Sequence, residues 1–140
     1  MNKPIAIIAH DVMKPALVEF LKEREAWFWG RKLVATGLTA EFIEQGGIDT
    51  EVEHLSPGKE GGYKELRERT ENQEFGMVLF FRDPEITQDY ENDIVDFVKA
   101  CNRHNVPLAT NPASAELLIL GLIRKEAAEK SRDRARETNP

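Results

Sequence analysis

The sequence predicts an α/β fold built on a mostly parallel five-stranded sheet with helices on both faces. Short apolar runs alternate five times with segments of helical spacing along the 140 residues, and such alternation calls for parallel strands joined by right-handed crossovers. The strongest runs, at 5–9 and 75–81, are predominantly apolar, as expected for strands covered on both faces. Polar clusters follow the runs, and parallel strands bring such clusters to one edge, where open α/β sheets bind ligands.

Each element is predicted from the period of its apolar residues. Segments 14–29 and 91–104 place apolar residues on one helical face, whereas 51–55 alternates and predicts a less buried strand. Thr39 is a candidate cap for a short helix that the glycines at 46–47 end. The predicted order is a strand at 5–9, a helix at 14–29, a strand at 32–35, a short helix, a strand at 51–55, a polar helix at 63–73, a strand at 75–81, a helix at 91–104, a strand at 106–109 and a helix at 113–123.

We expect one domain over residues 1–123, because no linker or internal repeat divides the chain. Residues 124–140 carry six Lys/Arg and four Asp/Glu, a net charge of +2 against −6 for the whole chain. This charged, Ala-rich segment is either a solvated helical extension or a frayed tail.

Composition excludes several classes of function. A net charge of −6 argues against general affinity for nucleic acid, and no stretch approaches the roughly 20 apolar residues of a membrane span. The single cysteine, Cys101, excludes an internal disulfide framework, and the three scattered histidines offer no pair of metal ligands. The first apolar run begins without the features of a signal peptide, so we expect a cytoplasmic protein.

Three polar clusters are candidates for binding an anion. His10 and Asp11 lie where the first strand meets a helix, with Lys14 one turn further on, and a helix N-terminus attracts anions. Asp11 serves equally well as a simple helix cap. The other clusters follow the second and third strands, where they offer hydroxyls and glycine amides or form ordinary turns; their candidate residues are Thr36, Gly37, Thr39, Ser56, Gly58, Gly61 and Gly62.

Two carboxylates complete the set of candidates. Asp83 ends the strand at 75–81, and Asp93 opens the next helix. A carboxylate at the ligand edge of a sheet suits proton transfer, although acids are also favoured in any first helical turn.

Taken together, the motifs AHD with Lys14, ATGLT, LSPGKEGG, FFRDP and HNVPLATNPASAE resemble those of the methylglyoxal synthase family over about residues 4–123. The resemblance implies a single flavodoxin-like, three-layer domain that assembles as a homohexamer. It also implies a lyase that converts dihydroxyacetone phosphate to methylglyoxal and inorganic phosphate without a cofactor. Lys14, Thr36, Thr39, Ser56 and Gly58 would hold the phosphate, and His10, Asp11, Asp83 and Asp93 would line the reacting end.

The chain departs from the family pattern at two positions that handle protons. Tyr63 stands where the family has its catalytic aspartate, and Tyr90 aligns with a histidine offered to the carbonyl. An unperturbed tyrosine is a poor base at neutral pH. Three alternatives follow: Glu60 acts as the base, Asp11 takes the proton, or the domain binds phosphate or a phosphorylated metabolite as a regulatory module without turnover.

Overall fold

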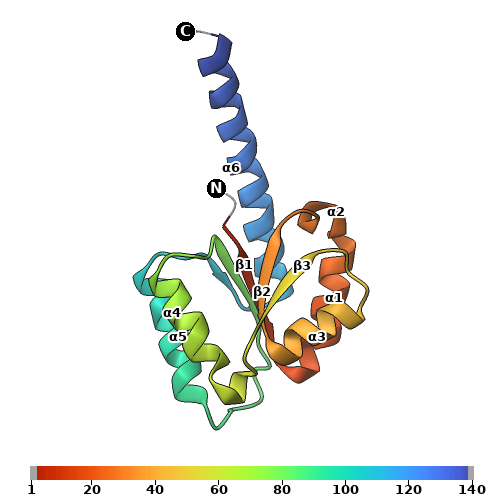
Figure 1. Cartoon of the computed structure of the whole chain (residues 1–140), viewed down its shortest axis with the longest axis vertical. Helices are drawn as coiled ribbons and strands as arrows, with labels where there is room; N and C mark the ends of the chain where they lie inside the picture. Colours follow the sequence, from red (N-terminus) through yellow and green to blue (C-terminus); the bar gives the residue numbers. More distant parts are fainter. Residues whose placement is uncertain (1–2, 139–140) are drawn as a thin grey trace.

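The computed structural model describes residues 3–138 and contains one five-stranded, entirely parallel sheet (Figure 1). The strand order is β3-β2-β1-β4-β5, so the chain winds outward from β1 in both directions. This arrangement confirms the predicted flavodoxin-like α/β domain. The strands are β1 (Ile5–Ala9), β2 (Lys32–Thr36), β3 (Glu51–Leu55), β4 (Met77–Phe81) and β5 (Leu108–Ala109).

Helices cover the sheet on both faces and make a three-layer domain (Figure 1). α4 and α5 pack together on one face, while α1, α3 and the start of α6 share the other. The helices are α1 (Lys14–Glu23), α2 (Glu25–Phe28), α3 (Gly37–Gln45), α4 (Gly62–Glu71), α5 (Glu91–Arg103) and α6 (Pro112–Thr138), with short 3₁₀ turns η1 (Asp11–Met13) and η2 (Gly58–Glu60).

The central strand β1 shows why its sequence is apolar throughout. Ile5 and Ile7 pack into the hydrophobic cluster under α1 and α3, whereas Ala6 and Ile8 pack into the cluster under α4 and α5. Successive side chains of a strand point to opposite faces, so a strand with helices on both sides has no polar face.

Four predictions of local structure need correction. The helix predicted over 14–29 is interrupted at Arg24, whose backbone N–H donates to Leu21 O instead of continuing the α-helical pattern. Thr39 lies inside α3 rather than at its cap, because the helix begins at Gly37. The strand predicted from residue 75 begins at Met77, and the one predicted over 106–109 is limited to Leu108–Ala109.

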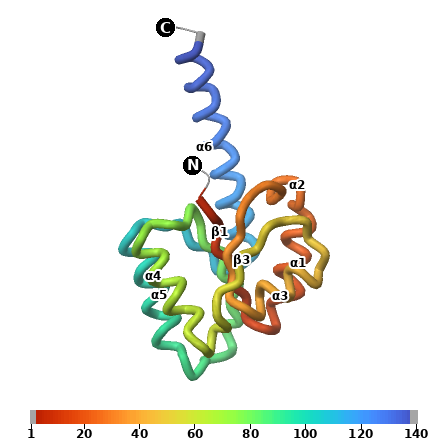
Figure 2. Tube along the Cα trace, viewed as in Figure 1, coloured from red at the N-terminus to blue at the C-terminus, as the bar shows by residue number. Residues whose placement is uncertain are grey.

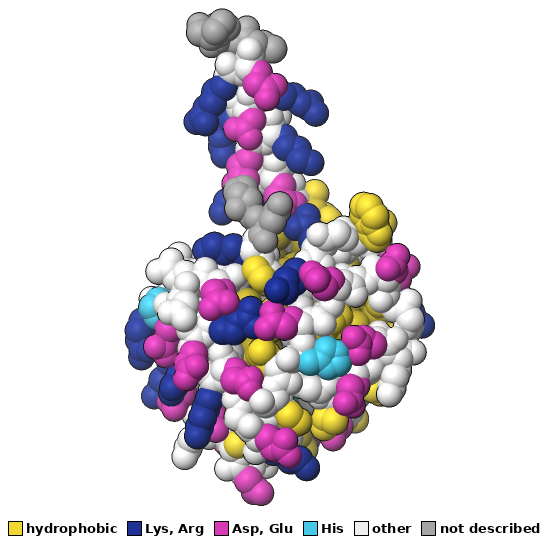
Figure 3. Space-filling model, viewed as in Figure 1, with side chains coloured by type: hydrophobic (Ala, Val, Ile, Leu, Met, Phe, Trp, Pro, Cys, Tyr) yellow, Lys and Arg dark blue, Asp and Glu magenta, His cyan; other side chains and the backbone are white. Residues whose placement is uncertain are grey.

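The last helix, α6, continues past the body of the domain to Thr138 (Figures 1 and 2). Arg31 donates to both carboxylate oxygens of Glu126 at 2.8 and 3.1 Å, and residues 131–137 are all exposed. The projecting part carries side chains of both charges (Figure 3). No helix within residues 3–138 is long and apolar enough to cross a membrane.

Candidate functional site

A cavity of about 510 Å³ lies where the first three strands end. It opens among the turns that follow β1 and β2, the loop after β3 and the segment before α5. The predicted site residues that line it are His10, Asp11, Lys14, Thr36, Thr39, Gly58, Tyr63 and Tyr90. Those outside its lining are Gly37, Ser56, Glu60, Gly61, Gly62, Asp83 and Asp93.

Lys14 supplies a nearly buried cation to the cavity. Its side chain is 10% exposed, and its ammonium donates to Ala9 O at 2.9 Å and to Asp11 Oδ1 at 2.6 Å. That hydrogen bond and the lysine charge hold the pKa of Asp11 below its usual value. A lysine at the first turn of a helix opposes the helix dipole, so the arrangement is favourable when an anion is also present.

Two threonine hydroxyls lie beside this cation. Thr36 and Thr39 are both buried, and their Oγ1 atoms are 3.4 Å apart. The Ala9 N–H donates to Thr39 Oγ1 at 3.3 Å, which ties α3 to the end of β1. Hydroxyls can rotate to donate to a ligand, and together with Lys14 they form a wall suited to a small anion.

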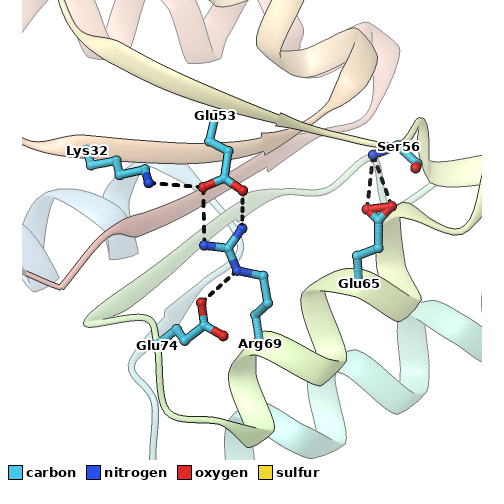
Figure 4. Close-up of polar contacts among 6 residues, drawn as sticks. All are labelled: Lys32, Glu53, Ser56, Glu65, Arg69 and Glu74. Carbon is cyan, nitrogen blue, oxygen red and sulfur yellow. Dashed lines mark hydrogen bonds and ion pairs between the residues drawn. The ribbon is translucent and has the colours of Figure 1, made fainter.

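The loop after β3 is shaped by contacts within the protein (Figure 4). The Ser56 N–H donates to both oxygens of Glu65 at 3.2 and 3.3 Å, so this amide is already occupied. Gly61 has a φ of +101°, and a Cβ on Gly62 would lie 2.2 Å from Ser56 O. The backbone path therefore requires glycine at both positions. Of the predicted residues in this loop, Gly58 alone lines the cavity.

A network of ion pairs holds α4 against the edge of the sheet (Figure 4). Arg69 pairs with Glu53 on β3 and with Glu74 after α4, and Lys32 on β2 also pairs with Glu53. This network fixes the helix that begins at the end of the glycine-rich loop, and so it helps to position the cavity wall.

His10 is buried in the cavity wall with one ring nitrogen unpaired. Its Nδ1 accepts a hydrogen bond from the Asp83 N–H at 2.8 Å, which places the proton of the neutral ring on Nε2. Burial lowers the pKa of His10, and the Arg82 guanidinium lowers it further. Its Nε2 has no hydrogen-bond partner among the described residues, so a neutral ring has one N–H donor to offer.

Tyr63 and Tyr90 form an aromatic wall. Their rings stack with centroids 5.7 Å apart and an interplanar angle of 27°. Tyr63 is only 3% exposed, and its ring packs against those of Phe80 and Phe97. Burial raises the pKa of both tyrosines. Neither phenol is therefore ionised near neutral pH, and Tyr63 is unsuited to act as a base.

The remaining predicted carboxylates lie elsewhere. Asp83 lines a separate hollow with Thr110 and Asn111, so the polar clusters after β4 and β5 do not join the cavity. Glu60 is exposed on η2, and Asp93 lies in the first turn of α5.

Sequence reasoning also missed lining residues. Lys59, Gln88 and Asp89 line the cavity. The segment that follows β4 returns to the cavity because Arg82 pairs with Glu91 at 2.8 Å and Gln88 N–H donates to the same carboxylate. Asp89 directly precedes Tyr90, a predicted site residue, and this adjacency was the sequence signal that could have identified it.

Comparisons with known proteins give a consistent result. Residues 16–110 match the family described as MGS-like domain. Proteins named methylglyoxal synthase from Cupriavidus taiwanensis and Borreliella afzelii are 41% and 39% identical, over 89% and 87% of this chain and 92% and 95% of their own lengths. A crystal structure of methylglyoxal synthase from Elizabethkingia anophelis NUHP1 superposes with a TM-score of 0.76 at 31% identity, over 84% of this chain and 76% of that one.

Proposed function

The chain belongs to the MGS-like domain family, and we propose that it is a cytoplasmic lyase of the methylglyoxal synthase type. It would convert dihydroxyacetone phosphate to methylglyoxal and inorganic phosphate. The observation that carries the proposal is the cavity that combines the cation of Lys14, the hydroxyls of Thr36 and Thr39 and the unpaired Nε2 of His10.

In the proposed complex, the phosphate occupies the end of the cavity formed by Lys14, Thr36 and Thr39. An ammonium held in a buried position forms strong, charge-assisted hydrogen bonds with phosphate oxygens. The first turn of α3 adds the unpaired backbone N–H groups of a helix N-terminus, apart from that of Gly37, which donates to Ser56 O at 3.4 Å.

The reaction begins with removal of a proton from the hydroxymethyl carbon beside the carbonyl. The C–H electron pair forms a C=C bond, and the carbonyl oxygen takes the negative charge of an enediolate. The Nε2–H of neutral His10, which is buried and has no partner among the described residues, would stabilise that oxygen once the substrate contacts it. The terminal hydroxyl then gives up its proton and forms the aldehyde C=O, the C=C bond shifts to the carbon that carries phosphate, and the carbon–oxygen bond to phosphate breaks. Phosphate leaves with that hydroxyl proton, and the remaining enolate gains a proton at its CH2 carbon to give methylglyoxal.

The proposal is tested by incubating the purified protein with dihydroxyacetone phosphate and following methylglyoxal and phosphate together. We expect equal molar amounts of both products, well above a heat-inactivated control. Release of neither product above that control would end the proposal that the chain is a lyase.

One observation favours a second candidate function, a phosphate- or phosphometabolite-binding regulatory module. Tyr63 and Tyr90 are neutral, packed side chains at the positions that the family resemblance associates with proton transfer. This candidate predicts that phosphate raises the Tm through binding to the native state, without any turnover of dihydroxyacetone phosphate.

We also propose that the chain forms a homo-oligomer, with the hexamer as the expected form. Leu117, Leu120 and Ile123 of α6 are 70%, 54% and 40% exposed, and Trp29 is 69% exposed. Exposed apolar side chains of this size suit subunit contacts. Light scattering coupled to gel filtration measures the assembly directly, and a monomeric mass would refute it.

A further inference from the structure

The proposed lyase reaction requires a base, and the cavity restricts the choice. Among the described residues, two carboxylates line the cavity, those of Asp11 and Asp89. Glu60, Asp83 and Asp93 are outside its lining. The choice of base is therefore between Asp11 and Asp89.

Asp11 is already engaged with the cation that the phosphate requires. Its Oδ1 lies 2.6 Å from Lys14 Nζ, and the lysine lowers its pKa. A carboxylate stabilised in its charged form is a weaker proton acceptor. Protonation of Asp11 would also break the ion pair that holds Lys14 during the reaction.

Asp89 has neither restriction. Its carboxylate has no hydrogen-bond or ion-pair partner within residues 3–138, and it lines the cavity beside Tyr90. The backbone around it is anchored, because Gln88 N–H donates to Glu91 Oε1 and Glu91 N–H donates to Gln88 O. Asp89 is thus a free carboxylate on a positioned segment.

We propose, resting on the lyase function proposed above, that Asp89 is the general base that removes the proton from the hydroxymethyl carbon. One Asp89 carboxylate oxygen forms the new O–H bond as the C–H bond breaks, and the C–H electron pair becomes part of the enediolate. Protonated Asp89 then gives this proton to the CH2 carbon of the enolate that remains after phosphate has left, which forms the methyl group of methylglyoxal and restores the carboxylate. The base role lies on the segment before α5, while the position of Tyr63 serves as packing.

The test compares Asp89→Asn with the wild type and with Glu85→Gln, a control that removes a carboxylate of the same loop from outside the cavity lining. A general base contributes about 100-fold to 10,000-fold, so we expect kcat of Asp89→Asn to fall at least about 100-fold. Its KM and the Tm increase produced by inorganic phosphate stay near wild type. Asp89→Glu should recover part of kcat, and Glu85→Gln should retain wild-type kcat.

The outcomes separate this inference from the function on which it rests. A wild type that turns over substrate and an Asp89→Asn variant of equal kcat would overturn the base assignment and leave the lyase function in place. A variant that loses the phosphate-induced Tm increase together with activity would also overturn it, because Asp89 would then act in binding. A wild type without turnover would overturn both.

Discussion

The two ends of the cavity are built from different kinds of structure. The end that we propose for the anion, formed by Lys14, Thr36 and Thr39, lies in the first turns after the central strands β1 and β2, and all three side chains are buried. The end that we propose for proton transfer, formed by Tyr63, Asp89 and Tyr90, comes from the start of α4 and the segment before α5.

The two ends differ in how firmly the fold holds them. Turns directly after central strands are fixed by the sheet and by both hydrophobic clusters, so side chains there keep their geometry. The segment before α5 is held by a few polar contacts such as Arg82 with Glu91, so we expect substitutions there to disturb the hydrophobic clusters less. We therefore expect binding and proton transfer to respond separately to substitution.

Lys14→Met removes the cation from the anion end and should have the largest effect. Removing one partner of a buried charged hydrogen bond costs about 2–5 kcal/mol, and each 1.4 kcal/mol is about tenfold. We expect kcat/KM to fall about 100-fold or more and the phosphate-induced rise in Tm to disappear. The control Lys22→Met, which removes an exposed cation of α1, should change neither; a Lys14→Met variant that still binds phosphate normally would locate the anion elsewhere.

Gly62→Ala tests the loop after β3, whose glycines lie near Thr36 at one end of the cavity and near Tyr63 and Tyr90 at the other. A Cβ at this position would lie 2.2 Å from the backbone oxygen of Ser56, and overpacking of this kind destabilises by about 1–3 kcal/mol. Thermal unfolding should show a Tm lower by several degrees. Gly121→Ala, where a Cβ meets nothing within 4 Å, is the matched control, and equal Tm values for both variants would contradict the loop geometry.

His10 should make stability depend on pH in a defined window. Its folded pKa is lowered by burial, so the unfolded chain binds the proton more readily than the native protein does. The free energy of unfolding should therefore decrease as the pH falls below about 6.5, the ordinary histidine value. Denaturant unfolding of His10→Gln should show a weaker decrease over pH 5–7 than the wild type, and identical slopes would refute the assignment of a neutral His10.

Tyr63→Phe should have the smallest effect. The phenol is neutral because burial raises its pKa, and its ring packs against Phe80 and Phe97. Removing the hydroxyl retains that packing, so we expect kcat to change by less than about threefold over the neutral range. A loss comparable with that of Asp89→Asn would return the proton-transfer role to Tyr63.

The same contrast explains which features sequence reasoning could find. The spacing of apolar residues alone predicted β1, β4 and α5 closely. The faces of a strand or helix that are buried determine which of its own residues are apolar. Lys14 and Thr36 were found because a turn after a parallel strand must lie at the ligand edge. These strands, this helix and these turn residues can be predicted from short segments of sequence together with the rule that ligands bind at the carboxyl edge of a parallel sheet.

Other features depend on contacts between distant residues. Asp89 was missed although its neighbour Tyr90 was predicted at the site, because no motif marks it and its place in the lining depends on how Arg82 and Glu91 hold the segment. Ser56 was expected to hold the phosphate, but it lies outside the cavity lining and its N–H donates to Glu65 of α4. Thr39 was assigned as a helix cap, whereas its hydroxyl contacts the end of β1. No local pattern specifies these three-dimensional contacts.

Calorimetric titration of the wild-type protein with inorganic phosphate, followed by competition with dihydroxyacetone phosphate, tests directly whether one cavity holds the phosphate of both. A single phosphate-binding cavity predicts saturable binding at one site per chain, with the substrate displacing phosphate from that site. Titration heats no larger than those of dilution, or phosphate that stays bound when the substrate is in excess, would contradict a single cavity that holds the phosphate of both.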